Sequence, residues 1–297
     1  MSIKLRKTAS GVHIFNRTTG MNCLLDEIIP PKDSWSLAPR HISIALTNLC
    51  NLSCEHCYAP KHNAYLDLAS IVRWACELDG LGAIGIGFGG GEPTLHPDFI
   101  EICKQVHDST ALAVSFTSHG HQLSETMVSQ LSPYVHFVRL SMDGCGNTYE
   151  RIRGRSFQVF QDQLGMISSK IRFGVNFVVN DETVGDLNKI NFLHDLGCEE
   201  LLILPQHATD KVPSISAKTH KQMTSWVAQY SGSMRLSVAA YAQEGLPTCN
   251  VFSEEKEIEN YAHVDADGFL KETSYSNHGV KINISVLDAL TKLKHTK

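Results

Sequence analysis

The chain has 297 residues, of which 42% are hydrophobic and 19% are charged, as is ordinary for a globular protein with a sizeable core. Its formal net charge of −5 and the lack of a dense basic run do not indicate a nucleic-acid partner held by phosphate neutralisation, and we expect none. No stretch approaches the roughly 20 apolar residues that span a bilayer, and no apolar region follows the first residues as in a signal peptide. We therefore expect a cytoplasmic protein with no membrane partner.

The N-terminal part predicts a small unit outside the main fold. Two short apolar runs within residues 11–27 flank the turn-forming residues 16–20, which predicts a β-hairpin. A proline-punctuated segment follows, with Pro30, Pro31 and Pro39. We expect residues 1–38 to form this hairpin and a linker.

From residue 39 onward, strand-like apolar runs alternate with amphipathic stretches of helical length. The expected strands are 42–46, 84–88, 112–116, 137–140, 172–179 and 201–204, and the expected helices between them are 68–79, 97–107, 124–131, 157–167 and 183–195. Such alternation predicts parallel strands covered by helices, and these units are too few for the eight of a closed barrel. Residues 39–232 are therefore expected to form an α/β partial (β/α)6 barrel with its chemistry at the C-terminal ends of the strands.

The pattern changes after residue 204. Residues 217–230 look helical, and 236–239 are a possible strand. Residues 260–271 predict a hairpin with Asp267-Gly268 in its turn, and 285–293 predict a terminal helix. We expect residues 233–297 to form a small α+β extension.

Three cysteines, Cys50, Cys54 and Cys57, stand in a C-x3-C-x2-C run directly after the first strand of the main unit. Closely spaced thiols in a reducing cytosol favour metal binding over disulfides. Thiolates hold iron–sulfur clusters, and three ligands for a cubane would leave one iron free to bind another molecule. A zinc site closed by His56 or His62, and three buried free thiols, are the alternatives at this point.

The loops after the next strands carry further polar chemistry. The second reads Gly89-Gly90-Gly91-Glu92-Pro93, where glycine backbone allows close approach of a ligand and the carboxylate suits an ammonium group. The third begins with Thr117 and adds small polar groups. The fourth contains Ser141, Asp143 and Arg153, and a guanidinium can pair with a ligand carboxylate. Together these groups suit a sulfonium that carries an amino acid.

This combination resembles the radical S-adenosylmethionine (radical SAM) superfamily over about residues 42–204. The three cysteines match its cluster motif, and Gly90-Gly91-Glu92-Pro93 matches its GGE motif, which holds the methionyl amine. Ser141-Met142-Asp143-Gly144 with Arg153-Gly154 is similar to its S-x-D-G…R-G segment. His56 stands where the family usually has a larger aromatic residue that offers backbone to the adenine. The resemblance implies cofactor contacts from His56, Gly90, Gly91, Glu92, Pro93, Thr117, Ser141, Asp143 and Arg153.

The resemblance also implies the chemistry. In the family, a [4Fe-4S] cluster passes one electron to SAM, whose cleavage gives methionine and a 5′-deoxyadenosyl radical that removes a substrate hydrogen. The electron is expected from an external flavodoxin- or ferredoxin-like reductant. The C-terminal part is similar to a SPASM or twitch extension, but Lys271-Glu272-Thr273-Ser274 stands where cysteines would be expected. We therefore expect a single cluster and an extension without one.

The substrate is the least constrained expectation. Resemblance to the SPASM-like group favours a ribosomally synthesised peptide that is cross-linked, epimerised or otherwise functionalised at a C–H bond. The alternatives are a small molecule in cofactor or natural-product biosynthesis and a non-catalytic cluster-binding or sensing protein. Epimerisation would require a thiol to return a hydrogen atom, and Cys145 and Cys249, in loop-like polar surroundings, are the candidates.

Overall fold

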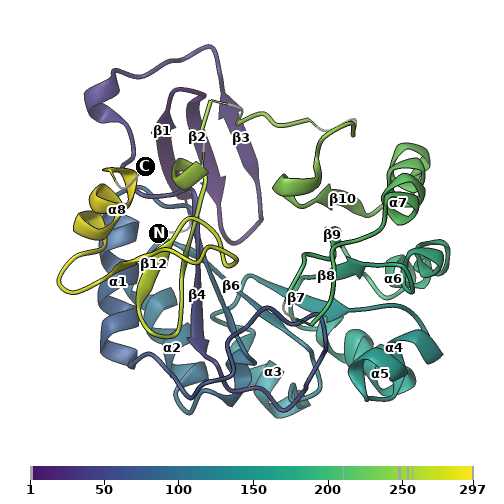
Figure 1. The fold of residues 1–297 in the computed structure, drawn as a ribbon. Coiled ribbons are helices and arrows are strands. Elements are labelled where there is room, and N and C mark those ends of the chain that lie inside the picture. Colours follow the sequence, from purple (N-terminus) through teal and green to yellow (C-terminus); the bar gives the residue numbers. More distant parts are fainter. Residues whose placement is uncertain (1–2, 210, 247–248, 253, 256, 296–297) are drawn as a thin grey trace.

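A computed structural model describes residues 3–209, 211–246, 249–252, 254–255 and 257–295. Its strands form a three-stranded antiparallel sheet at the N-terminus and a ten-stranded sheet that makes up the main unit (Figure 1). Within the described residues, no helix combines the length and the apolar character needed to cross a bilayer.

The N-terminal sheet consists of β1 (Ile3–Thr8), β2 (Gly11–Asn16) and β3 (Asn22–Leu25). The expected hairpin is confirmed by the antiparallel pairing of β2 with β3. Strand β1 was not predicted, because its alternation is inverted: Ile3 and Leu5 are exposed, whereas Lys4 and Arg6 are buried. Arg6, only 1% exposed, explains this arrangement, since its Nε lies 3.1 Å from the Glu255 carboxylate and its other nitrogens donate to backbone carbonyls.

The main sheet confirms the six expected strands of a partial barrel. They are β4 (His41–Thr47), β5 (Gly85–Gly90), β6 (Ala113–Ser118), β7 (Phe137–Met142), β8 (Phe173–Val179) and β9 (Glu200–Pro205), and each pairs in parallel with the next. Strand β10 (Arg235–Val238) adds a further parallel strand beside β9. The sheet thus continues past residue 232, and the domain boundary expected there stays a prediction.

Helices cover the outer side of the curved sheet (Figure 1). The expected ones are present as α1 (Leu68–Gly80), α2 (Phe99–Ser109), α3 (Glu125–Leu131), α5 (Phe157–Ser168) and α7 (Ala217–Gln229). Helix α4 (Asn147–Arg153) lies in a segment expected to be a loop. The single helix expected over residues 183–195 is instead a 3-10 turn, η3 (Val184–Lys189), followed by the short α6 (Phe192–Asp195). Leu187, Ile190 and Leu193 are all buried, and their spacing of three suits a 3-10 turn as well as an α-helix.

The C-terminal extension closes onto the other edge of the same sheet. The expected hairpin is confirmed by the antiparallel pairing of β11 (Tyr261–Val264) with β12 (Phe269–Lys271), and β11 also pairs in parallel with β4. Strand β13 (Val280–Lys281) and the expected terminal helix α8 (Val286–His295) complete it. Glu77 of α1 accepts hydrogen bonds from the first backbone N–H groups of α8, which fixes this helix against the barrel. The remaining 3-10 turns are η1 (Lys32–Ser34), η2 (Pro93–Leu95), η4 (Ala240–Ala242) and η5 (Glu257–Glu259).

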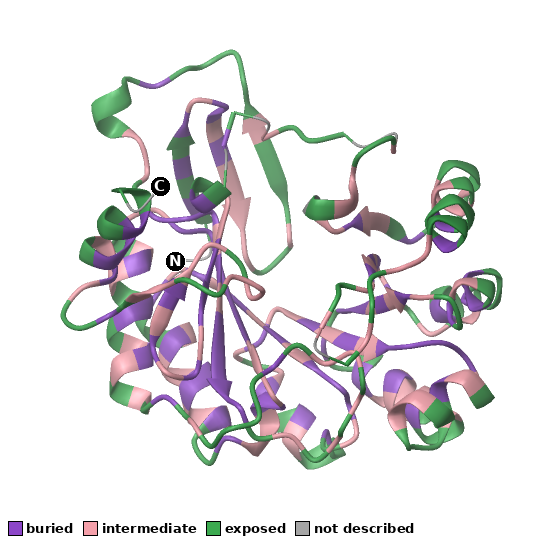
Figure 2. Cartoon of the chain, in the orientation of Figure 1, coloured by how far each residue is buried: buried purple, intermediate pink, exposed green. Residues whose placement is uncertain are grey.

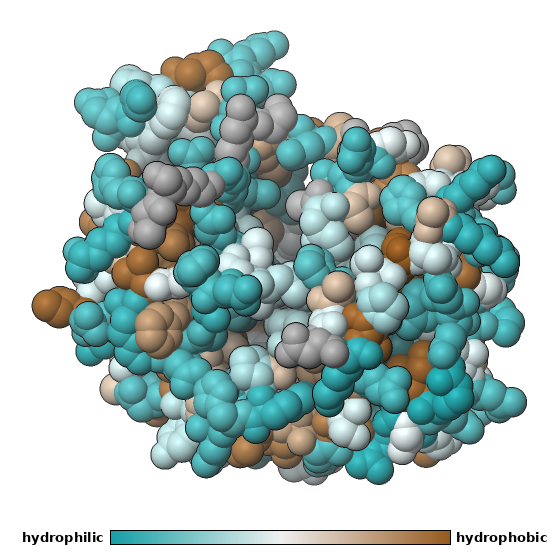
Figure 3. Space-filling model, viewed as in Figure 1, coloured by the Kyte–Doolittle hydropathy of each residue, from teal (hydrophilic) through white to brown (hydrophobic). Residues whose placement is uncertain are grey.

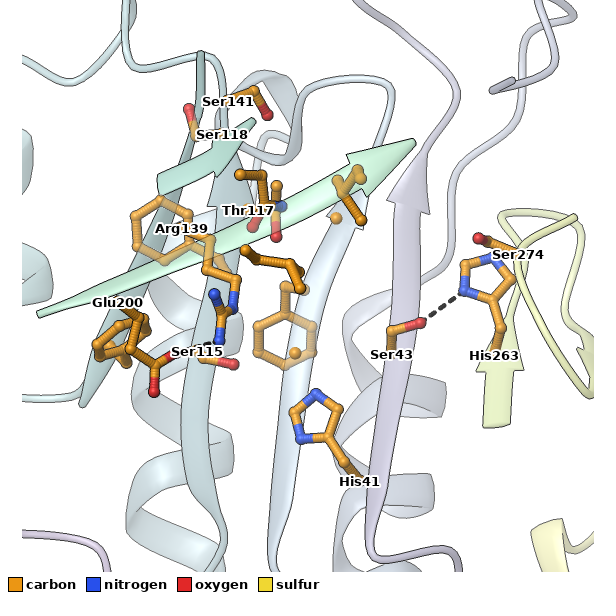
Figure 4. Close-up of a pocket in the computed structure, with 18 of the residues that line it drawn as sticks. His41, Ser43, Ser115, Thr117, Ser118, Arg139, Ser141, Glu200, His263 and Ser274 are labelled. Carbon is orange, nitrogen blue, oxygen red and sulfur yellow. Dashed lines mark hydrogen bonds and ion pairs between the residues drawn. The ribbon is translucent and has the colours of Figure 1, made fainter. Parts of the chain in front are cut away.

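The two faces of the main sheet differ in chemistry. Buried segments run along the strands of the main sheet and the sides of the helices that cover it (Figure 2). Ile42 and Ile44 of β4, like Ile86 and Phe88 of β5, are fully or almost fully buried and belong to the hydrophobic core. The residues between them, such as His41 and Ser43, are polar or are glycine and face the inside of the barrel (Figure 4). The core therefore lies between sheet and helices, and the inside of the barrel is left hollow. Figure 3 shows this hollow near the centre of the visible surface.

Candidate functional site

A cavity of about 960 Å³ fills the inside of the barrel. Its size lies at the upper end of the usual range for ligand pockets, roughly 300–1,000 Å³. The residues predicted from sequence that line it are Cys50, Cys54, His56, Cys57, Gly90, Gly91, Glu92, Thr117, Ser141, Asp143 and Arg153. The fold thus brings loops from four successive strands to one place. Pro93, Cys145 and Cys249 are not among the lining residues.

The three thiols follow β4 and are free and half-buried. Each sulfur has a nearby donor: the Leu52 N–H lies 3.4 Å from Cys50, Lys61 Nζ lies 3.3 Å from Cys57, and Arg153 Nη1 lies 3.6 Å from Cys54. Burial raises the pKa of the Cys50 and Cys54 thiols, so a bound metal is needed to hold them as thiolates. Donors directed at the sulfurs suit the negative charge of a thiolate-ligated cluster.

The arrangement does not match a mononuclear zinc site. In the described part of the chain, no three Cys, His, Asp or Glu side chains are placed to hold one metal ion. The two histidines that could have been the fourth zinc ligand contact carboxylates instead. His56 Nε2 lies 3.1 Å from Asp143, and His62 Nε2 lies 2.7 Å from Asp267. A cubane places each thiolate on a different iron, so its ligands need not converge on one point. The residues present therefore fit a cluster better than a single ion.

The glycine loop after β5 packs directly on the start of the thiol loop. The Gly91 N–H donates to the Thr47 carbonyl at 2.7 Å, and the Glu92 N–H donates to the Leu49 carbonyl at 2.7 Å. A Cβ on Gly90, whose φ is +124°, would lie 2.2 Å from the Thr47 oxygen, and one on Gly91 would lie 2.2 Å from the Leu49 oxygen. Only glycine permits this contact, which holds the two loops in register.

Glu92 is 1% exposed and rigidly held. Its carboxylate accepts hydrogen bonds from the Thr94 hydroxyl at 2.7 Å, the Ser118 hydroxyl at 2.8 Å and the His119 N–H at 3.0 Å. Burial nevertheless raises its pKa above the ordinary value, so a cation beside it would stabilise its charged form. Pro93 starts η2 and is buried behind this carboxylate. The contact of Glu92 with a ligand ammonium stays a prediction.

Arg153 and Asp143 form a buried pair that the sequence did not predict as a pair. Arg153 is the last residue of α4, and its Nη2 lies 2.6 Å from Oδ2 of Asp143, which is fully buried. Burial pushes the pKa of Asp143 upward, but the charge of Arg153 and the contact with His56 outweigh it and hold that pKa below its usual value. Arg153 Nε and Asp143 Oδ1 are buried atoms with no hydrogen-bond partner among the described residues, while both residues line the cavity.

An aromatic cluster beside the thiols was missed by the sequence analysis. Tyr58, His207, Tyr241 and Tyr275 come from four separate segments, and all line the cavity. The Tyr275 ring centroid lies 4.8 Å from that of Tyr58 and 4.6 Å from that of His207, and the Tyr241 hydroxyl donates to the Pro205 carbonyl. The position of Tyr58 directly after Cys57 was the only local signal. The cluster joins the thiol loop to β9 and to the C-terminal extension.

The two candidate hydrogen-donating thiols lie away from the cavity. Cys145 is buried, its N–H donates to the Asp186 carboxylate at 2.9 Å, and burial raises the pKa of its thiol to about 12. Cys249 is exposed. Their proposed role stays a prediction that this geometry does not support.

Comparison with known proteins places the chain in a family. The model of the Radical SAM superfamily matches residues 44–226, which is more than half of the chain. Sporulation killing factor maturation protein SkfB of Bacillus subtilis is 34% identical over 124 residues, which cover 40% of this chain and 30% of SkfB. Fe-coproporphyrin III synthase of Methanosarcina barkeri is 28% identical over 153 residues, which cover 49% of this chain and 38% of that enzyme. The chain therefore spans less than half the length of these curated relatives.

The fold is similar to that of Streptococcus suis SuiB bound to precursor peptide SuiA. The TM-score is 0.77 with 12% identity, and the match covers 97% of this chain and 87% of SuiB. Members of the matched family use a [4Fe-4S] cluster and SAM, and the thiol loop and the glycine loop both fall within the matched residues. On the sequence match and the fold together, the chain belongs to the radical SAM superfamily.

Proposed function

We propose that this chain is an enzyme that holds one [4Fe-4S] cluster on Cys50, Cys54 and Cys57 and binds SAM beside it. When bound by these three thiolates, such a cluster would supply one electron for the reductive cleavage of SAM to methionine and a 5′-deoxyadenosyl radical. The observation that carries the proposal is the meeting of the thiol loop, the glycine loop and the buried Arg153–Asp143 pair at one wall of the cavity.

The protein's own residues would orient SAM. The backbone after β5 lies close to the thiols because glycines permit it, and Glu92 is a fixed acceptor for the ammonium group. Arg153 contacts both Asp143 and Cys54 and lines the cavity, and its guanidinium would donate to the carboxylate. Thr117 and Ser141 also line the cavity (Figure 4). The aromatic cluster lines the cavity beside the thiol loop, where its rings would limit the access of water.

We infer that the substrate is a ribosomally synthesised peptide, which the enzyme cross-links, epimerises or otherwise functionalises at a C–H bond. Support comes from the similarity to SkfB, a sporulation killing factor maturation protein, and to SuiB, which binds a precursor peptide. Strand β3 is an end strand in the order β1-β2-β3, and its residues are mostly exposed, so it offers an edge to which a peptide can add as a strand.

A small-molecule substrate is the second candidate. Its support is the similarity to Fe-coproporphyrin III synthase and the position of the cavity, whose walls are the strands themselves. A non-catalytic cluster protein is the third candidate. The charged groups that line the cavity beside the thiols, Glu92, Asp143 and Arg153, argue against it, because a cluster alone requires neither an acceptor for an ammonium group nor a donor for a carboxylate.

The test is anaerobic reconstitution with iron and sulfide, followed by SAM and a flavodoxin- or ferredoxin-like reductant. Formation of 5′-deoxyadenosine supports the radical function. If none forms even with a strong chemical reductant, the result favours the third candidate, a non-catalytic cluster protein. A short peptide encoded beside this gene is then added in deuterated buffer. A mass change in that peptide supports the peptide proposal, and an unaltered peptide together with active SAM cleavage would favour the small molecule.

A further inference from the structure

The inside of the barrel has a second polar region, on the side of the thiols that faces the N-terminal sheet. Arg139 of β7 lies four residues before Asp143, which corresponds to about 13 Å along an extended strand. Its guanidinium reaches into the cavity near Ser115 and His41 and contacts the Glu200 carboxylate (Figure 4). None of these residues belongs to the cofactor contacts described above.

The strand register explains why Arg139 meets Glu200 across an intervening strand. Arg139 lies opposite Gly174 of β8, and Gly174 lies opposite Glu200 of β9. A Cβ on Gly174 would lie 3.0 Å from the Glu200 Cβ and 3.0 Å from the Phe137 ring, so a side chain here would press on the pair. Glycine thus lets the two charged side chains meet over β8.

The region carries more positive than negative charge. Glu200, 4% exposed, contacts the guanidiniums of both Arg139 and Arg235. Burial lowers the pKa of His41 to about 4, so this imidazole is neutral at physiological pH. The nearby Glu199 is already paired with Arg172 at 2.5 Å. One carboxylate therefore faces two guanidiniums.

Arg139 also has a hydrogen-bond donor without a partner among the described residues. This donor is Nη1, a buried atom, and other atoms of the side chain, which is 28% exposed, lie at the wall of the cavity. Burial without full compensation lowers its pKa to about 10, at which the group is still cationic at neutral pH. Gly87 and Gly89 of β5 place no side chains in the hollow, and a Cβ on Gly89 would meet nothing within 4 Å. Space therefore occurs together with a cation whose only carboxylate partner among the described residues is shared with Arg235.

We propose that this region is an anion subsite in which Arg139 binds a carboxylate of the substrate, while the hydrogen to be removed lies toward the thiols. The inference rests on the proposed function and adds the chemical class of the substrate. An acidic side chain and a C-terminal carboxylate offer the same chemistry to the guanidinium, which can donate to the carboxylate oxygens of either.

The test measures ligand binding to the cluster-loaded protein with SAM, by saturation-transfer NMR. The probes are N-acetylglutamate α-amide for an acidic side chain, N-acetylglycylglycine for a C-terminal carboxylate, and N-acetylglutamine amide as the neutral control. At least one acid should bind roughly tenfold or more tightly than the neutral amide, the range of a charge-assisted hydrogen bond. Equal binding of all three probes would overturn the proposal, and the tighter acid identifies the source of the carboxylate.

A graded set of variants tests the charge argument. The preference for the acid should be largest in Glu200→Gln, which removes the competing anion. It should be smaller in the wild type, smaller again in Arg235→Met, and smallest in Arg139→Met. Arg139→Met leaves Glu200 paired with Arg235, so the fold is expected to persist, and Arg151→Met on the outer surface should match the wild type. A preference that survives Arg139→Met refutes the subsite. Formation of 5′-deoxyadenosine without substrate reports separately on the proposed function.

Discussion

Replacing Arg153 with Met tests the buried pair at the site most sharply. Arg153 is 9% exposed and Asp143 is fully buried, with 2.6 Å between Nη2 and Oδ2. Removing one partner of a buried ion pair leaves an uncompensated charge and destabilises a protein by about 3–5 kcal/mol. We therefore expect the free energy of unfolding of the cluster-free protein to fall by that amount near pH 7.

The loss should depend on pH in a defined direction. In the wild type the pKa of Asp143 lies below its usual value, so the pair stabilises the fold above the unfolded pKa, and this contribution is lost as the pH falls through the folded pKa. Without Arg153, burial dominates and raises that pKa. The protonated acid is then favoured in the fold, and stability is lost as the pH rises from about 4. The difference in the free energy of unfolding between the variant and the wild type should therefore increase from pH 4 to pH 7.

Urea unfolding followed by tryptophan fluorescence measures these differences. Arg151→Met is the matched control, because Arg151 pairs with Glu182 on the surface, where both side chains are more than half exposed and the pair contributes at most about 1 kcal/mol. The double variant Arg153→Met with Asp143→Asn should recover most of the loss and show a flat pH dependence. The reasoning would be refuted if Arg153→Met and Arg151→Met lowered the free energy of unfolding equally. It would also be refuted if the difference between Arg153→Met and the wild type did not change with pH.

Three further predictions follow from contacts around the cavity. Gly91→Ala should reduce iron content after reconstitution, because its Cβ would lie 2.2 Å from the Leu49 oxygen, whereas Gly89→Ala, with nothing within 4 Å, should load iron like the wild type; equal loading would contradict the packing argument. Tyr275→Ala should cost about 2–4 kcal/mol of stability and uncouple 5′-deoxyadenosine formation from product, while Tyr275→Phe retains the stacking and should behave like the wild type in both assays. Cys145→Ala should leave product formation intact, since this thiol does not line the cavity, and arrested turnover with intact SAM cleavage would instead make it the hydrogen donor.

Much of the architecture could be predicted because its signals are local. Alternating strand and helix patterns predicted the six parallel strands β4–β9, and the loops after them predicted which residues would meet at the cavity. Parallel strands place their C-terminal ends at one edge, so motifs far apart in sequence converge without knowledge of the packing. Strand β1 was missed because burial of Arg6 by Glu255, a contact across 249 residues, overrides the usual alternation.

The parts that could not be predicted depend on packing between distant segments. Asp143 and Arg153 were both expected to contact the ligand, but their pairing depends on where α4 ends. Tyr58 meets Tyr275 only because the extension folds back beside the thiol loop. Arg139 and Glu200 meet because the strand between them carries a glycine at the matching register. No periodicity or spacing along the chain encodes such contacts.

The most direct test of the central claim is EPR spectroscopy of the reconstituted, reduced protein before and after addition of SAM, alongside iron and sulfide analysis. Three thiolates that hold a cubane predict about four iron and four sulfide per chain. They also predict a signal that changes when SAM binds the iron without a protein ligand, and loss of that signal in Cys50→Ala, Cys54→Ala or Cys57→Ala. One tightly bound zinc per chain, or a cluster whose signal is indifferent to SAM, would contradict the account.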